Sequence, residues 1–218
     1  MDILARFGPH KQLLSSAVIA DVLDALGQPA GVLPGTIRPL NPKWKLFGRA
    51  ATLSAVSVSA VPERPYDVEL ACVDSLRSGD VLVATTNGDQ SSALWGELLS
   101  TASRAHGAVG VVTDGLTRDA AQIMAMDFPV FAAGFSPLDS KGRLDGVAFG
   151  QPIRIGSCLI RPGDWIFADI DGIVVAPVEV AEEALTRALE KVSAENRVRA
   201  ELVKGRSAAE VFAEYKIL

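Results

Sequence analysis

The sequence of 218 residues is poor in the residue types that soft-metal, disulfide and redox sites require. It contains two cysteines, Cys72 and Cys158, and two histidines, His10 and His106. The cysteines lie in apolar surroundings and form neither a metal-ligand spacing nor a disulfide framework, which favours a reducing cytoplasm. Any metal bound by this chain is therefore expected to have oxygen ligands, which indicates Mg²⁺ or Mn²⁺.

The sequence also lacks an excess of positive charge and any long apolar run. It carries 21 lysines and arginines against 26 aspartates and glutamates, a formal net charge of −5. This balance argues against a nucleic-acid-binding face. No apolar stretch reaches the ~18 residues of a membrane span, and no signal peptide is apparent. We expect a soluble, cytoplasmic protein that binds neither nucleic acid nor membrane.

What the sequence does contain is an alternation of amphipathic helices and short apolar strands with no linker between them. Residues 1–10 look like a loose arm, and 134–150 like a glycine-rich loop with a short strand. Apolar periodicity predicts helices over about 13–26, 66–76, 180–203 and 208–215. Strands are predicted near 48–60, 81–85, 108–112, 130–133, 153–155, 158–160, 165–169 and 173–177. The pattern indicates one α/β domain over residues 1–218, with its helices outside and a long C-terminal helix.

The stretch from Trp95 to Met124 gathers groups that chemistry on a small anion requires. Gly96-Glu97-Leu98-Leu99 opens a helix whose apolar face is expected to include Trp95, Leu98, Leu99 and Ala102. A helix start offers unpaired backbone N–H groups and the positive end of a dipole, and a glycine lets a ligand approach the backbone closely. After a buried strand and a turn, Arg118 and Asp119 stand where the next helix begins, the usual ligand position in open α/β sheets.

Arg118 and Asp119 are the candidate ligand-binding pair. Arg118 can bind a carboxylate with two parallel hydrogen bonds, and Asp119 can hold a hard divalent metal. Each group also fits an ordinary role, because an Arg-Asp pair can be surface charge and Glu97 is favourable in the first turn of any helix. Their combination in one helix–strand–helix unit favours a site.

Several motifs of the sequence resemble the RraA-like family. They are residues 21–27 (DVLDALG), 96–99 (GELL), 114–119 (DGLTRD), 168–177 (ADIDGIVVAP) and 195–199 (ENRVR). That family includes class II pyruvate aldolases acting on 4-hydroxy-4-methyl-2-oxoglutarate and 4-carboxy-4-hydroxy-2-oxoadipate, and the regulator of ribonuclease activity A. The resemblance implies a layered α/β/β/α sandwich. It also implies a homotrimer, or a homohexamer as a pair of trimers, with active sites between subunits.

The resemblance implies roles for the residues of the central unit. Asp119 would hold Mg²⁺ or Mn²⁺ directly, and Arg118 would bind the carboxylate and the 2-oxo oxygen of a keto acid. Substrate binding would be completed by hydrogen bonds from the backbone N–H groups of Gly96, Glu97, Leu98 and Leu99. Glu97 stands where the aldolases have an acid that places a water for proton transfer, with a longer side chain than the aspartate expected there.

Residues outside the central unit receive roles from the same resemblance. An acid supplied by the neighbouring subunit falls at Glu195, with Glu201 as the alternative. The C-terminal helices, about residues 180–218, would contribute to the oligomer. Gln122 stands where the family often has an acid, which bears on fine specificity.

The implied activity is retro-aldol cleavage of a 4-hydroxy-2-oxo dicarboxylic or tricarboxylic acid to pyruvate and a second keto acid. Charge develops on the former 2-oxo oxygen, where a metal and an arginine stabilise the transition state. Oxaloacetate decarboxylation passes through the same enolate and is expected as a side activity. Few lysines lie near the unit, which disfavours a Schiff-base aldolase. The sequence shows no glycine-rich nucleotide loop to support the methyltransferase label that some relatives carry.

The competing interpretation is a non-catalytic interaction protein, in the manner of the namesake regulator, whose trimer binds a ribonuclease or a helicase. The Arg118-Asp119 pair does not exclude it, whereas Glu97 together with Glu195 favours the enzyme.

Overall fold

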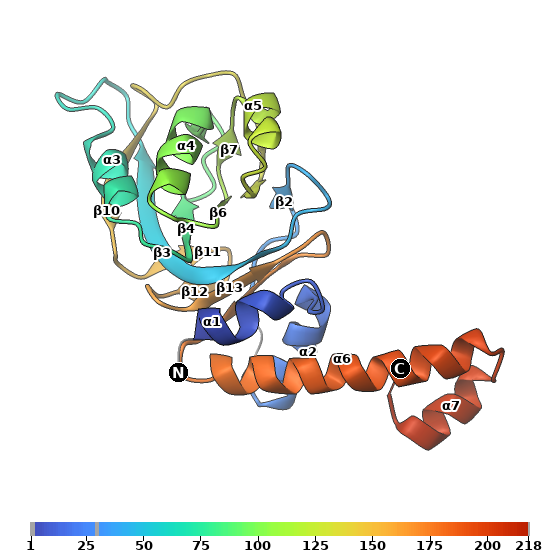
Figure 1. Cartoon of the computed structure of the whole chain (residues 1–218). Coiled ribbons are helices and arrows are strands. Elements are labelled where there is room, and N and C mark those ends of the chain that lie inside the picture. Colours follow the sequence, from blue (N-terminus) through green and yellow to red (C-terminus); the bar gives the residue numbers. More distant parts are fainter. Residues whose placement is uncertain (1–2, 29–30, 218) are drawn as a thin grey trace.

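The computed structural model describes residues 3–28 and 31–217, and a nine-stranded sheet forms its centre (Figure 1). The strand order is β1 (Gly31–Val32), β14 (Ile173–Ala176), β13 (Trp165–Ala168), β3 (Leu46–Ser57), β4 (Asp80–Thr85), β6 (Gly110–Thr113), β8 (Val130–Ala132) and β2 (Arg38–Pro39). β3 pairs in parallel with β4. The first part of β3 also pairs antiparallel with β13, and the second part of β3 pairs antiparallel with β10 (Leu144–Phe149). The 12-residue β3 therefore joins the two halves of the sheet.

Three apolar cores separate the layers of the domain. Alternate residues of one strand point to opposite faces, so Val81 and Val83 enter the inner core whereas Leu82 and Ala84 face the outer helices. The inner core joins Val83 and its neighbours to Ile166 and Val175 from the other half of the sheet. The hairpin of β11 (Ile153–Ile155) and β12 (Cys158–Ile160) closes this core.

Helices cover both outer faces. α3 (Asp67–Asp74), α4 (Glu97–Ala105) and α5 (Ala120–Ala125) lie on the half containing β4 and β6 (Figure 1). α1 (Ile3–Phe7), α2 (Ser16–Ala25) and α6 (Ala181–Val203) cover the half containing β13 and β14. The α/β/β/α sandwich, the single domain and the long C-terminal helix are confirmed. No helix of the described chain combines the length and apolarity needed to cross a membrane.

The helix ends follow local signals in the sequence. Ser15 caps α2 by accepting a hydrogen bond from the Val18 backbone N–H at 3.2 Å, and Gly27 follows the helix with φ +71°. Gly205, with φ +84°, separates α6 from α7 (Ala208–Tyr215). The boundaries predicted for the C-terminal helices are therefore close to those observed.

Two expectations about irregular segments need correction. Residues 3–10 are not a loose arm, because α1 and the 3-10 helix Gly8–His10 form there and Phe7 is buried against α2 and α6; residues 1 and 2 lie outside the described chain. Residues 134–150 contain β9 (Gly134–Phe135) and the six-residue β10, which completes the sheet beside β3. Long-range packing orders both segments.

Candidate functional site

A small three-stranded sheet brings the two predicted motifs together. β5 (Ala93–Trp95) pairs in parallel with β7 (Leu116–Thr117), and β7 pairs in parallel with β9. The Arg118 backbone N–H donates to the Trp95 carbonyl at 2.9 Å, so the ends of β5 and β7 lie side by side. Because both strands run the same way, the start of α4 and the Arg118-Asp119 pair emerge at one edge, as expected for ligand sites in parallel sheets.

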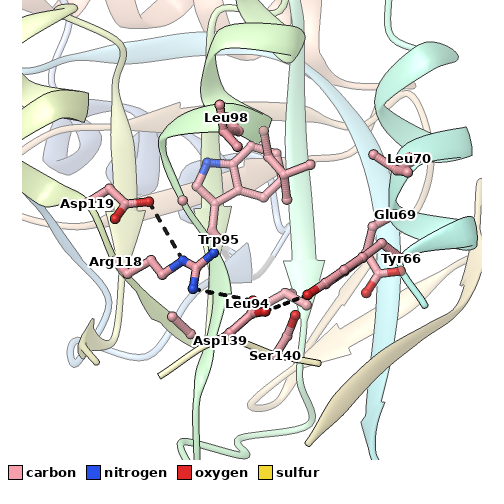
Figure 2. A pocket seen from close by; sticks show the side chains of 13 residues that line it. Tyr66, Glu69, Leu70, Leu94, Trp95, Leu98, Arg118, Asp119, Asp139 and Ser140 are labelled. Carbon is pink, nitrogen blue, oxygen red and sulfur yellow. Dashed lines mark hydrogen bonds and ion pairs between the residues drawn. The ribbon is translucent and has the colours of Figure 1, made fainter. Parts of the chain in front are cut away.

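Arg118 lies between two carboxylates. Its Nε is 3.7 Å from Asp119 Oδ2, and one terminal nitrogen is 3.4 Å from Asp139 Oδ1. The Tyr66 hydroxyl donates a hydrogen bond to the other carboxylate oxygen of Asp139. Figure 2 shows this chain of contacts running from Asp119 through Arg118 and Asp139 to Tyr66. The guanidinium is therefore oriented from both sides while its side chain stays about one-third exposed, at 36%.

Asp119 and Gly96 fit tightly against each other. The Glu97 backbone N–H donates to Asp119 Oδ2 at 3.3 Å, so the first free N–H of α4 already faces a carboxylate oxygen. A Cβ added at Gly96 would lie 2.9 Å from the same Oδ2 atom. The φ of Gly96 is −156°, an extended value that any residue adopts, so space rather than backbone freedom favours glycine there.

Two residues of the site have left-handed backbones without being glycine. They are Asp119, with φ +58°, and Tyr66, with φ +67°, which precede α5 and α3 respectively. Such conformations cost free energy and concentrate where the surrounding structure has to hold a side chain in place. Both residues line the same cleft.

The cleft has a volume of about 290 Å³. Its walls come from α3, β5, the start of α4, the Arg118-Asp119 turn and the loop after β9 (Figure 2). It is lined by Tyr66, Glu69, Leu70, Ala93, Leu94, Trp95, Gly96, Leu98, Leu99, Arg118, Asp119, Asp139 and Ser140. A shallower hollow of about 440 Å³ adjoins it, lined by Arg118, Asp119, Phe135 and their neighbours. Arg118 and Asp119 thus face both spaces.

The surroundings of the cleft raise the pKa values of two side chains, Tyr66 and Glu69. Burial first, and the hydrogen bond to Asp139 second, raise the pKa of the Tyr66 phenol to about 12, which keeps it a proton donor. Burial also raises the pKa of Glu69, which is 2% exposed. Glu69 Oε1 accepts from the Gly146 N–H at 3.0 Å, whereas Oε2 has no hydrogen-bond partner in the described chain. Glu69 therefore ties α3 to β10 with one oxygen only.

The donor set of the cleft suits a hard cation held largely through water. Within the described residues no group of three or more His, Cys, Asp or Glu side chains converges as a metal cage. Mg²⁺ usually takes one or two carboxylates and keeps several waters, and Asp119 offers a 39% exposed carboxylate beside the space that Gly96 leaves. Asp119 therefore fits the metal-binding role predicted for it, with water completing the coordination.

The predicted site residues separate into two groups. Gly96, Leu98, Leu99, Arg118 and Asp119 line the cleft together. The Glu97 backbone takes part, while its side chain lies outside the cleft lining and accepts a hydrogen bond from Thr101 Oγ1 at 2.7 Å.

The two candidate intersubunit acids do not join this cleft. Glu195 borders a separate hollow on α6, together with Val198, Arg199, Leu202 and Ile217. Glu201 forms ion pairs with Lys204 at 2.6 Å and Arg206 at 3.2 Å, which lower its pKa. Within one subunit, α6 lies on the opposite side of the domain from α4 (Figure 1).

The apolar face expected for the helix after Gly96 is confirmed at Leu99 and Ala102, which pack against the core, and needs correction at two positions. Trp95 belongs to β5, with its indole N–H bonded to Ser100 Oγ at 2.8 Å, and Leu98 is 77% exposed. The buried positions of α4 include Ser100 and Ser103. Leu98 is exposed because it stands at the rim of the cleft.

Sequence reasoning missed Tyr66, Glu69 and Asp139. Asp139 is placed by pairing with a distant strand, because the Ala93 N–H donates to the Leu138 carbonyl at 3.0 Å and Ala93 bridges Asp139. Tyr66 carried a weak signal as the first residue of a predicted helix. A lone aspartate in a glycine-rich segment offered none.

Known proteins resemble this chain along most of its length. The family model RraA-like, Aldolase/RraA, matches residues 16–175. A protein of Halalkalibacterium halodurans named "Putative 4-hydroxy-4-methyl-2-oxoglutarate aldolase" is 32% identical over 193 residues, which cover 88% of this chain and 84% of that protein. Protein DlpA of Legionella pneumophila is 28% identical over 201 residues, covering 92% of this chain but 32% of DlpA, so this chain spans about a third of that relative.

A solved structure extends the comparison to the fold. Streptomyces coelicolor RraAS2, described as an unusual member of the RNase ES inhibitor RraA protein family, has a TM-score of 0.75 and 31% sequence identity. The match covers 85% of this chain and 91% of that chain.

Proposed function

The chain belongs to the RraA-like family, and from that premise we propose that it is a metal-dependent pyruvate aldolase that cleaves a 4-hydroxy-2-oxo acid. The observation that supports this most is the convergence of Arg118, Asp119 and the start of α4 on one cleft. The name of the Halalkalibacterium halodurans relative supplies the first substrate to test, 4-hydroxy-4-methyl-2-oxoglutarate.

Arg118 is proposed to bind the carboxylate and the 2-oxo oxygen of the substrate. Its guanidinium is held between Asp119 and Asp139, so little reorganisation is needed when the anion arrives. Tyr66 acts as a positioning residue because its hydroxyl fixes Asp139. The backbone N–H groups of Gly96 to Leu99 lie at the positive end of α4 and favour negative charge at the same place.

Asp119 is the residue proposed to hold Mg²⁺ or Mn²⁺. When bound there, the ion supplies Lewis-acid stabilisation of the negative charge that develops on the 2-oxo oxygen. Asp119 also keeps the Glu97 N–H oriented toward the cleft edge through its Oδ2 atom.

In the proposed reaction the 4-hydroxyl group loses one proton and C3 of the pyruvate enolate gains one. A water placed by Glu97 takes the proton of the 4-hydroxyl group, the C3–C4 bond breaks, and C4 becomes a carbonyl. The electron pair of the broken bond forms the enolate of pyruvate, which takes a proton at C3. The Glu97 carboxylate accepts a hydrogen bond from Thr101 outside the cleft lining, so it has to rotate toward the cleft to place this water. Oxaloacetate decarboxylation gives the same enolate and is proposed as a side activity.

We propose that the site is completed between subunits of a trimer or of a pair of trimers. Glu195 lies on α6 and does not line the cleft of its own chain. Because α6 and α4 lie on opposite sides of the domain (Figure 1), Glu195 is proposed to reach the cleft of a neighbour. Glu201 is the weaker candidate because Lys204 and Arg206 already bind its carboxylate. On this proposal the C-terminal helices serve assembly as well as catalysis.

A second candidate is a regulator that binds a ribonuclease, in line with the description of RraAS2. The left-handed backbone of Asp119 beside Gly96 favours the enzyme, because a protein-binding surface does not require that close approach.

The test is pyruvate release from 4-hydroxy-4-methyl-2-oxoglutarate and from oxaloacetate, measured with Mg²⁺, with Mn²⁺ and with excess chelator. We expect metal-dependent turnover that falls by roughly 100-fold or more in Arg118→Ala and Asp119→Ala, because each removes a group acting on the developing charge. Arg187→Ala is the matched control, since it removes an exposed arginine whose ion pair in the described chain is with Glu183 on α6. Circular dichroism and size-exclusion chromatography check that each variant is folded.

Two results would contradict the proposal. One is turnover that survives the chelator and both cleft variants. The other is an intact oligomer with no turnover of either substrate, which would favour the regulator.

A further inference from the structure

Two hydrogen bonds join the start of α3 to the segment that leads into β10. In the first, the Tyr66 hydroxyl donates to the Asp139 carboxylate. In the second, the Gly146 backbone N–H donates to Glu69 Oε1 at 3.0 Å. Tyr66 and Glu69 both line the cleft from the α3 side (Figure 2), so both contacts belong to the wall of the site.

The chain between the two contacts is ordered in both segments. On α3, the Leu70 N–H donates to the Tyr66 carbonyl at 2.9 Å, which closes the first turn of the helix. On the other segment, the Leu144 N–H donates to the Ser140 carbonyl at 2.8 Å, which closes the turn that opens β10. Because neither segment has loose chain between its two contacts, a shift at one contact also moves the other.

The backbone of β10 leaves room for the Glu69 carboxyl group. The pairing of β10 with β3 shifts register between Gly146 and Ala148, an irregularity of the kind that bends strands beside active sites. A Cβ added at Gly146 would lie 2.7 Å from Glu69 Oε2 and 3.2 Å from Val68 Cβ. The close approach of α3 to β10 therefore depends on the missing side chain at position 146.

The buried carboxyl group of Glu69 is costly for the fold. The residue is 2% exposed, and its Oε2 has no hydrogen-bond partner in the described chain. Burial, and to a smaller extent the charge of Asp145 on β10, raise the pKa of Glu69, and the other titratable groups that interact with it are Tyr66 and Cys72 on α3. An apolar side chain would pack there without this cost. Only a hydrogen-bond acceptor, however, fixes the position of α3 along β10 directionally.

We infer that Glu69 is a positioning residue for Arg118. Its contact with Gly146 sets where α3 lies along β10, which brings the Tyr66 hydroxyl to Asp139. Asp139 in turn holds the guanidinium of Arg118 at 3.4 Å. All of these contacts lie within one chain, so they are independent of what a neighbouring subunit or a metal adds to the cleft. The effect on turnover rests on the proposed function.

The first test follows the position of Tyr66 without using turnover. The chain has two tyrosines, Tyr66 and Tyr215, so 3-fluorotyrosine labelling gives two ¹⁹F NMR signals, which Tyr66→Phe assigns. In Glu69→Leu, which removes the acceptor, the Tyr66 signal should move toward its shift in the urea-unfolded chain. In Glu69→Gln it should stay in place, because the amide oxygen still accepts from the Gly146 N–H.

Asp67→Leu is the matched control for Glu69→Leu. Asp67 is the other acid in the first turn of α3, and its side chain is 52% exposed, so its loss should leave the Tyr66 signal in place. A Tyr66 signal that is unchanged in folded Glu69→Leu, or that moves equally in Asp67→Leu, overturns the inference.

Gly146→Ala tests the same contact from the side of β10. The new Cβ would lie 2.7 Å from Glu69 Oε2, so the carboxyl group has to move, and the Tyr66 signal should shift as in Glu69→Leu. This variant keeps every side chain of the cleft and decides the inference if Glu69→Leu does not fold. A Tyr66 signal unchanged in Gly146→Ala counts against the positioning role.

A double-mutant cycle connects Glu69 to the reaction. Glu69→Leu should lower kcat/KM for pyruvate release roughly 10-fold, because Arg118 loses its alignment, and Glu69→Gln should restore most of it. In a Tyr66→Phe background, Glu69→Leu should cause less than about 2-fold further loss, since residues of one hydrogen-bond network are not additive. Losses that multiply fully would show that Glu69 acts on the fold alone and would overturn the inference.

The NMR and turnover measurements separate failure of the inference from failure of the proposed function. A Tyr66 signal that moves in Glu69→Leu, in a protein whose wild type turns over neither substrate, supports the positioning of Tyr66 and overturns the aldolase. Wild-type turnover that is unchanged in Glu69→Leu supports the aldolase and overturns the positioning role.

Discussion

At the scale of single residues, Gly96 matters through the space that its missing side chain leaves beside Asp119. In Gly96→Ala the new Cβ would meet Asp119 Oδ2 at 2.9 Å and Arg118 Cγ at 3.3 Å, so one of the two side chains has to move. The backbone before α4 can accept alanine at position 96, because the φ of −156° is an extended value that alanine also adopts. We expect kcat/KM for pyruvate release to fall by about 10-fold to 100-fold and the apparent affinity for Mg²⁺ to weaken.

Gly172→Ala is the control for that substitution, because a Cβ there meets no atom of the described residues within 4 Å. Steady-state kinetics and a Mg²⁺ titration of both variants measure the effect. An unchanged kcat/KM in Gly96→Ala would show that the close approach to Asp119 has no functional consequence.

Glu69 gives a prediction about pH and stability. Burial raises the pKa of Glu69 above its ordinary value of 4.5, so the folded chain keeps this proton where the unfolded chain has released it. The resulting stabilisation is complete below the unfolded value and is lost as the pH rises through the folded value. Glu69→Gln does not titrate, so wild type should lose free energy of unfolding relative to this variant as the pH rises above 4.5.

Urea unfolding at several pH values measures that difference. Glu63→Gln, which changes an exposed glutamate, gives the baseline for loss of one surface carboxylate. A difference between wild type and Glu69→Gln that stays constant with pH would show that Glu69 is ionised alike in the folded and unfolded chains.

At the scale of helices and strands, local patterns predicted most elements but only part of the buried face of α4, where Leu99 and Ala102 pack against the core and Leu98 is exposed. α6 and α7 were predictable because their apolar stripes, with the intervening Gly205, are long and regular. In α4 the leucines at its start border the cleft, whereas the small hydroxyl residues Ser100 and Ser103 are buried. Hydrophobicity alone cannot predict the burial of Ser100, whose hydroxyl accepts a hydrogen bond from the Trp95 indole and donates one to the Gly96 carbonyl.

The sequence identified the part of the site that is local in the chain and missed the part built by tertiary pairing. Arg118 and Asp119 could be found because a strand end and a helix start flank them. Asp139 could not, since its place beside Arg118 follows from the contact of its loop with β5. The same holds for α1, whose burial depends on α2 and α6 rather than on its own five residues.

At the scale of the whole molecule, α6 divides into two parts with different surroundings. Its first half packs in the core with α1 and α2 through Ala181, Ala184, Leu185 and Ala188. Its second half leaves that core and contacts α7, so the two helices extend from the body of the domain (Figure 1). An extension of this kind suits contact with another subunit, and Glu195 stands at its beginning.

Subunit mixing tests whether Glu195 acts in a neighbour's cleft. Arg118→Ala and Glu195→Gln chains, each expected to be nearly inactive alone, are co-expressed in equal amounts. Half of the clefts then carry Arg118 and half of their neighbours carry Glu195, so about a quarter of the wild-type activity per site should return in randomly assembled oligomers. A mixture of Arg118→Ala with Asp119→Ala should restore nothing, because both residues belong to the cleft of one chain. Restoration with Glu201→Gln in place of Glu195→Gln would assign the shared acid to Glu201, and no restoration with either would confine the site to a single subunit.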